Sequence, residues 1–200
     1  MKATAKAVLD RLSPIAAASA GGRPVLVEEF WVPDSHERAD LVAVAGELWA
    51  FEIKSPRDSL ARLPRQATAF SRLFDRCVAV LATPHLQDGM QRIPSWWGVI
   101  DAGEQDDDPL KWIRQPTANP EVDLELLVKL LWKQEALAAA AELGIKTSER
   151  ISRQALWRRL LREAEPASLK LCVRSAVAGR DASSARIPTR RWSIKQPSPA

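Results

Sequence analysis

The chain has 200 residues, of which 46% are hydrophobic and 27% charged, with a formal net charge of +4. This length and composition fit one medium-sized globular domain, alone or with a small appendage. No apolar run reaches membrane-spanning length, and Asp10, Arg11 and Pro14 interrupt the N-terminal apolar stretch, which argues against a signal peptide. Cys77 and Cys172 each lie within an apolar stretch, which favours reduced thiols in a cytoplasmic protein over a disulfide.

The charge is distributed unevenly along the chain. From Gly144 to the end there are 13 Lys and Arg residues against 4 Asp and Glu, a net charge of +9, whereas the preceding part has 16 basic and 21 acidic residues, a net charge of −5. A basic C-terminal segment behind an acidic body favours a polyanionic partner near that segment, although basic tails are also common solubilising segments.

The first half of the chain predicts a mixed sheet with helices packed on it, because antiparallel strands are followed by a helical crossover. Pro64 implies that the second helix is kinked or starts nearer residue 63. The expected elements are a helix at 3–19 with a possible break at Pro14, a strand at 23–32, a hairpin of strands at 41–44 and 48–53, a helix from Asp58 or Ser59 to 75, a strand at 76–82, a short helix at 86–92 and a strand at 97–101.

The second half predicts a helical extension. Residues 102–120 are acidic and rich in proline, which indicates a surface loop, and a Leu-rich helix at 121–143 ends at Gly144. Two further helices are expected, one that starts at Thr147 or Ser148 and a short one over 168–178. The expected organisation is a core at 1–105, a loop at 106–120, a helical extension at 121–180 that is basic from 144, and a disordered basic tail at 181–200.

Three charged residues lie in the otherwise apolar hairpin. Asp40 stands at the start of the first strand, and Glu52 and Lys54 are two residues apart near the end of the second. A period of two puts Glu52 and Lys54 on one face of the sheet and Phe51 and Ile53 on the other. A surface ion pair of Glu52 with Lys54 and a turn-capping role for Asp40 are the structural alternatives to a functional site.

These residue types suit metal-assisted cleavage of a phosphodiester bond. Mg²⁺ takes oxygen ligands from one or two carboxylates and keeps several waters, so Asp40, Glu52 and the Ile53 carbonyl are candidate ligands of Mg²⁺ or Mn²⁺. Lys54 would orient the attacking water or assist its deprotonation.

Asp40 followed by Glu52-Ile53-Lys54, with a helix before the hairpin and a helix and strand after it, resembles the core of the PD-(D/E)XK nuclease superfamily. Gln66 and Phe70 match the Q-x-x-x-Y motif of its RecB-like members, with Phe in place of Tyr. The run from Arg38 to Gly98 is also similar to the MmcB-like DNA-repair nucleases. The first motif departs from the common pattern, because Ala rather than Pro precedes Asp40.

This resemblance covers about residues 1–101 and implies a restriction-endonuclease-like α/β fold and cleavage of DNA. It implies that Asp40, Glu52, Lys54 and Gln66 are catalytic and that an upstream acidic residue assists at the metal. Glu28 and Glu29 are adjacent, so only one of them faces the site; Glu28 is preferred.

The helical extension supplies candidate partner surfaces. Its arginines would contact DNA phosphates or form a solvated helix face, and these are Arg150, Arg153, Arg158, Arg159 and Arg162. The Leu-rich helix at 121–143 would mediate homodimer formation or bind a partner protein.

The sequence therefore predicts a Mg²⁺-dependent DNA endonuclease acting in repair, mobile-element or defence biology. A DNA-binding or partner-binding protein that retains the fold without catalysis is the rival hypothesis.

Overall fold

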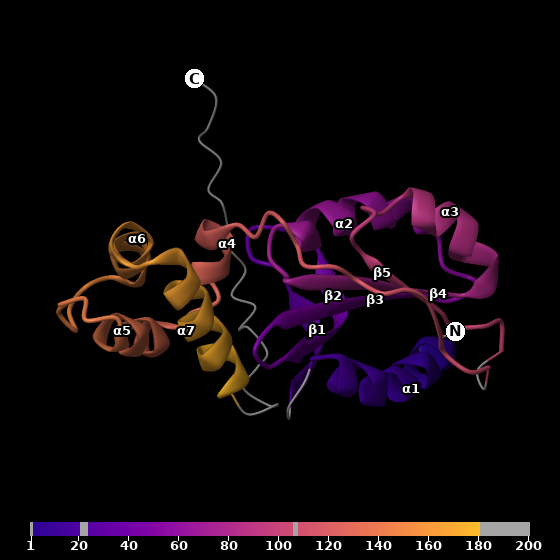
Figure 1. The fold of residues 1–200 in the computed structure, drawn as a ribbon, viewed down its shortest axis with the longest axis horizontal. Coiled ribbons are helices and arrows are strands. Elements are labelled where there is room, and N and C mark those ends of the chain that lie inside the picture. Colours follow the sequence, from indigo (N-terminus) through magenta and orange to yellow (C-terminus); the bar gives the residue numbers. More distant parts are fainter. Residues whose placement is uncertain (1, 21–23, 106–107, 181–200) are drawn as a thin grey trace, which may run out of the picture.

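The computed structural model describes residues 2–20, 24–105 and 108–180, and the basic tail expected at 181–200 lies outside them. Its centre is a six-stranded mixed sheet in the order β1-β2-β3-β4-β5-β6 (Figure 1). The pairs β3–β4 and β4–β5 are parallel and the other three neighbouring pairs are antiparallel. The strands are β1 (Val25–Trp31), β2 (Arg38–Val44), β3 (Leu48–Lys54), β4 (Arg76–Leu81), β5 (Gly98–Asp101) and β6 (Lys111–Arg114).

Helices cover both faces of the sheet, and a helical cluster lies beyond one end of it (Figure 1). Helix α1 packs on one face, and α2 and α3 lie over the other. The helices are α1 (Lys2–Ala20), η1 (Leu60–Arg62), α2 (Leu63–Ser71), η2 (Thr83–His85), α3 (Leu86–Gln91), α4 (Leu124–Val128), α5 (Lys133–Glu142), α6 (Arg153–Glu163) and α7 (Pro166–Ala178). The expected α/β class, a mixed sheet flanked by helices with a helical C-terminal region, is confirmed.

Strand β3 is the central strand, and all seven of its residues are buried. Phe51 and Ile53 belong to the apolar cluster on the α1 side, whereas Leu48 and Ala50 belong to the cluster on the other side. The alternation expected for a strand is therefore present, and it puts Glu52 and Lys54 on the face covered by α2.

Pro14 and Pro64, which bear on the expected helix boundaries, occupy different positions in their helices. Pro14 lies inside an unbroken α1. Pro64 lies in the first turn of α2, where its missing N–H costs no helical hydrogen bond, and the start near residue 63 is confirmed. The preceding turn is the 3₁₀ helix η1, in which the Ser59 hydroxyl accepts a hydrogen bond from the Ala61 N–H.

The expected loop at 102–120 contains a sixth strand. Strand β6 pairs antiparallel with β5, with Ile100 opposite Trp112 and Asp101 opposite Lys111. The run Lys-Trp-Ile-Arg has too few residues to stand out as a strand by its own pattern, and its pairing with an existing strand edge stabilises it.

The expected helix at 121–143 is two helices, because the chain is extended at Trp132. Neither Pro nor Gly marks this break. The Leu130 carbonyl accepts a hydrogen bond from Arg180 (2.5 Å) and the Leu131 carbonyl accepts one from the Trp157 indole (3.2 Å). Glu135 accepts from the backbone N–H of Trp132 at 2.7 Å. Two distant side chains and the nearby Glu135 thus satisfy the backbone groups that an unbroken helix would have used.

The Leu-rich segment is buried within the chain itself. Its side chains join the same apolar cluster as the α2 face of the sheet, and α4 and α5 pack against α6 and α7. The leucines that suggested a docking surface are therefore not exposed; they are Leu126, Leu127, Leu130 and Leu131.

Asp75 links the sheet to the helical region. Its carboxylate accepts from the backbone N–H of Leu48 at 2.8 Å and from Arg174 of α7 at 2.5 Å. The side chains of Asp75 and Arg174 are 9% and 15% exposed, so this ion pair is largely removed from water.

The substitution Asp75→Asn is expected to lower the free energy of unfolding by about 3 kcal/mol, because it leaves the Arg174 guanidinium without its counter-charge in a buried position. Urea unfolding followed by circular dichroism measures the change. The matched control is Asp88→Asn, which breaks the exposed Asp88–Arg92 pair on α3 and should cost less than about 1 kcal/mol. Equal effects of the two substitutions would contradict the linking role of Asp75.

Among the helices of the described residues, none is long and apolar enough to cross a membrane.

Candidate functional site

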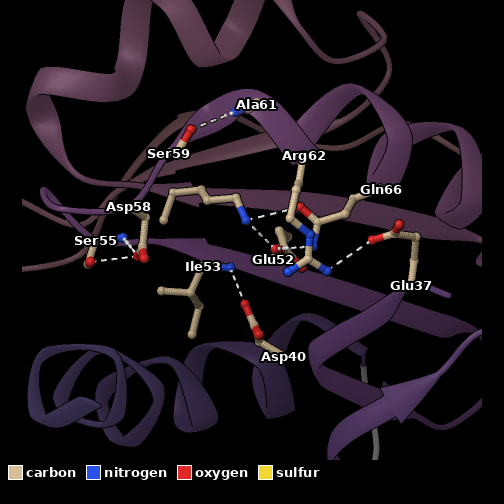
Figure 2. A network of polar contacts seen from close by, with 11 residues as sticks. Glu37, Asp40, Glu52, Ile53, Ser55, Asp58, Ser59, Ala61, Arg62 and Gln66 are labelled. Carbon is tan, nitrogen blue, oxygen red and sulfur yellow. Dashed lines mark hydrogen bonds and ion pairs between the residues drawn. The ribbon is translucent and has the colours of Figure 1, made fainter. Parts of the chain in front are cut away.

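Strands β2 and β3 bring three of the sequence-predicted residues together on adjoining strand ends. Leu41 of β2 pairs with Phe51 of β3 in the antiparallel register. Asp40 immediately precedes Leu41 in β2. The Asp40 carboxylate accepts a hydrogen bond from the backbone N–H of Ile53 at 2.7 Å (Figure 2). This bond fixes Asp40 beside the segment that carries Glu52 and Lys54.

Glu52, Lys54 and Gln66 form a closed, buried triangle of side chains (Figure 2). One oxygen of Glu52, Oε1, accepts from Lys54 Nζ and from Gln66 Nε2, both at 2.5 Å. Lys54 Nζ also donates to Gln66 Oε1 at 3.0 Å. Gln66 comes from α2, so the helix above the sheet orients both charged groups of β3.

The other oxygen of Glu52, Oε2, is buried and has no hydrogen-bond partner among the described residues. A carboxylate oxygen in that position loses its hydration without compensation. Either a proton or a cation would stabilise it.

The two carboxyl groups of the site have raised pKa values. Burial raises the pKa of Glu52 to about 7, and the negative charge of Asp40 adds to this effect, against the opposing effects of Lys54 and Gln66. Burial also raises the pKa of Asp40, opposed by the Ile53 N–H and by Lys54. The negative charge of Glu29 adds to the rise in the pKa of Asp40.

The two upstream acidic residues, Glu28 and Glu29, are both exposed in β1. The charge of Glu29 contributes to raising the pKa of Asp40, and its carboxylate forms an ion pair with Arg38. Glu29 has a φ of 58°, a left-handed conformation that non-glycine residues rarely adopt and that occurs often at functional sites.

Four of the five predicted DNA-contacting arginines belong to α6, and Arg150 precedes it. Helix α6 lies in the helical cluster beyond the end of the sheet (Figure 1). Arg153 stacks over the Trp157 ring at 4.8 Å, and Arg159 and Arg162 pair with Glu163. Arg150 and Arg158 are exposed. These side chains form a basic helix surface, and they do not join the site on β2 and β3.

Sequence reasoning missed the residues that flank the site. Glu37, just before β2, is buried and pairs with Arg62 and Arg65. The spacing of Arg62 and Gln66, four residues apart on one helical face, is a signal that could have identified the arginine. For Glu37 no comparable signal exists, because its burial depends on how the β1–β2 connection packs against α2.

The turn after β3 is held by Asp58, whereas Ser59, the other candidate for the start of the helix, is the residue that caps η1. Asp58 Oδ2 accepts from the Ser55 backbone N–H at 2.7 Å and from the Ser55 hydroxyl at 2.5 Å. The turn therefore fixes the direction in which the chain leaves Lys54 and enters η1 and α2.

Within the described ranges, no group of three or more His, Cys, Asp and Glu side chains is arranged to hold a metal ion. Any metal at this site would have two carboxylates, those of Asp40 and Glu52, as side-chain ligands.

Residues 3–195 match the model of the family described as bacteriophage P4 protein cII. Protein cII of Enterobacteria phage P4 is 37% identical over 76 residues, which cover 38% of this chain and 29% of the phage protein. A protein of unknown function from Silicibacter pomeroyi superposes with a TM-score of 0.43 at 22% identity, over 70% of this chain and 86% of that one. The chain belongs to the family of bacteriophage P4 protein cII.

Proposed function

We propose that this member of the cII family hydrolyses phosphodiester bonds of DNA in a reaction that requires Mg²⁺ or Mn²⁺. The observation that carries the proposal is the convergence of Asp40, Glu52 and Lys54 on adjoining strand ends, with one buried Glu52 oxygen that has no partner in the part of the chain that the structure describes. Two carboxylates with raised pKa values and a lysine in one site suit phosphodiester hydrolysis better than a structural ion pair.

The donor set fits a hard divalent cation. Mg²⁺ is commonly bound through one or two carboxylates and keeps several waters. Asp40, Glu52 through Oε2 and the Ile53 carbonyl would supply the protein oxygens. When bound, such an ion stabilises negative charge on a phosphoryl oxygen and lowers the pKa of a bound water.

Lys54 is positioned to act on the attacking water or on the phosphate. An ammonium group has three N–H donors, and the bonds to Glu52 and Gln66 use two of them. The third donor is available to a water or a phosphate oxygen. Gln66 is a positioning residue, since it holds both Glu52 and Lys54 in place.

DNA is proposed as the substrate because of the basic character of the C-terminal region, where the net charge is +9 from Gly144 onward. The exposed arginines of the α6 region, including Arg150 and Arg158, would bind phosphates away from the cleaved bond. We place this reaction in the cytoplasm.

The test is cleavage of plasmid and single-stranded DNA with Mg²⁺ or Mn²⁺, comparing the wild type with Asp40→Asn. The Asn side-chain oxygen can still accept from the Ile53 N–H, so this variant removes the charge and preserves the local fold. Metal-dependent cutting by the wild type, its loss in Asp40→Asn and its block by EDTA are expected. A wild type that binds DNA without cutting it would instead favour the non-catalytic DNA-binding protein.

A further inference from the structure

Beside the site, a buried carboxylate holds two exposed arginines. The side chain of Glu37 is 2% exposed, whereas those of Arg62 and Arg65 are 60% and 68% exposed. Arg62 Nη2 donates to Glu37 Oε2 at 3.2 Å and Arg65 Nε donates to Oε1 at 2.5 Å. Each oxygen of one carboxylate is therefore bound to a different guanidinium group.

The two arginines precede Gln66 in the sequence, Arg62 in η1 and Arg65 in α2, and Arg62 lies over the site. Figure 2 shows its side chain extending beside Gln66 and Glu52 to reach Glu37. A guanidinium group has five N–H donors, and among the described residues the bonds to Glu37 use one donor of each arginine. Most of their donors are thus left for a ligand.

A structural role alone does not account for this arrangement. Exposed ion pairs contribute about 0–1 kcal/mol, and burial of a carboxylate has an unfavourable desolvation cost. The cluster of one carboxylate and two guanidinium groups has a net positive charge, and its cations are held in fixed positions rather than left on mobile side chains. Fixed guanidinium groups are well suited to bidentate binding of phosphate.

A groove of about 350 Å³ continues from this cluster. Its walls come from the connection between β1 and β2, from α2 and from α4, and they include His36, Arg65 and Arg72. Arg65 and Arg72 therefore both lie along this groove on the α2 side, and Arg72 is paired with Asp123.

We infer that Glu37 positions Arg62 and Arg65 as a clamp for a backbone phosphate of DNA next to the site. The identity of the polyanion as DNA rests on the proposed function. The arginines are binding residues, and Glu37 is a positioning residue that acts through them.

The test is the salt dependence of binding to a short fluorescein-labelled DNA duplex, measured by anisotropy in EDTA so that no cleavage occurs. Arg62→Ala and Arg65→Ala are each expected to reduce the slope of log K against log salt by about 1, the value for one lost phosphate contact. The matched control is Arg92→Ala, which removes an exposed, ion-paired arginine of α3 and should leave the slope unchanged.

Glu37→Gln separates a clamp from a general electrostatic effect. The substitution makes the protein more positive by one charge, so non-specific attraction alone would tighten DNA binding. A clamp predicts weaker binding, because both arginines lose the carboxylate that fixes them. If circular dichroism shows that this variant does not fold, the two exposed arginine variants decide the question.

Unchanged slopes for both arginine variants would overturn the inference, as would tighter binding by folded Glu37→Gln or no duplex binding by the wild type. The outcome is separable from that of the cleavage assay. A protein that binds through the clamp and never cuts would refute hydrolysis alone, whereas one that cuts with unchanged slopes would refute the clamp alone.

Discussion

Replacing Lys54 with Met is expected to lower the rate of DNA hydrolysis at saturating Mg²⁺ by about 10²–10⁴-fold, the usual contribution of a positioned proton-transfer group. Met keeps an unbranched chain of similar length in a position that is 8% exposed, and it removes the donor that faces Glu52 and Gln66. DNA binding in EDTA should change little, since the lost charge is buried.

Loss of the ammonium group has a second consequence at Glu52. The positive charge of Lys54 opposes the rise in the pKa of Glu52, so in Lys54→Met that pKa should rise further. Protons would then compete more strongly with a divalent cation for the carboxylate. The variant should therefore need a higher Mg²⁺ concentration than the wild type at neutral pH. The difference between the two proteins should be smaller at higher pH.

Rate against Mg²⁺ concentration, measured at two pH values, separates the two consequences. If saturating Mg²⁺ restores the wild-type rate in Lys54→Met, Lys54 acts through metal affinity alone. If the rate stays low at saturating Mg²⁺, Lys54 acts in the reaction itself. Lys111→Met is the matched control, because Lys111 is exposed in β6, outside the basic region that begins at Gly144; its rate should equal that of the wild type.

The sequence was informative at this site because the pattern of β3 has a simple physical reading. A period of two in a buried strand separates Glu52 and Lys54 from Phe51 and Ile53, and the structure has that separation. The amide of Gln66 meets Glu52 as expected for a helix packed over the strand that precedes it in the chain.

The features that the sequence did not predict depend on contacts between distant residues. The break at Trp132 is stabilised by donors from Trp157 and Arg180, and neither is visible in the local pattern. Burial of Glu37 depends on arginines 25 and 28 residues further along the chain. Local periodicity indicates which face of an element is apolar. It contains no information on which distant side chain will form a hydrogen bond or ion pair with a given polar group.

The pKa of Glu52 leads to a second prediction, on stability rather than activity. In the metal-free protein, the free energy of unfolding should fall as pH rises from about 4.5 to about 7. The pKa of Glu52 is raised from 4.5 to about 7 by folding, so in this range the folded state holds a proton that the unfolded state has released. Stability decreases with pH wherever the folded state binds more protons. At 1.36 kcal/mol per pKa unit, the total fall is about 3 kcal/mol.

Urea unfolding at a series of pH values in EDTA measures this fall, and Glu52→Gln isolates its origin. Asp40, whose pKa is also raised by burial, contributes to the wild-type profile as well, so the informative quantity is the difference between the two proteins. Gln cannot take up the proton, and the profile of the variant should be flatter by about 3 kcal/mol across the range. Parallel profiles would contradict the assignment of a raised pKa to Glu52.

A divalent cation should reverse the effect in the wild type alone. Mg²⁺ competes with the proton for Glu52, so it should stabilise the folded protein more at pH 8 than at pH 5.5. The gain is about 2.7 kcal/mol when the free ion is at about 100 times its Kd. In Glu52→Gln the gain should be small at both pH values, because the carboxylate whose Oε2 lacks a partner is gone. Equal stabilisation of both proteins would mean that the ion binds elsewhere, and the unpartnered oxygen would then need a different explanation.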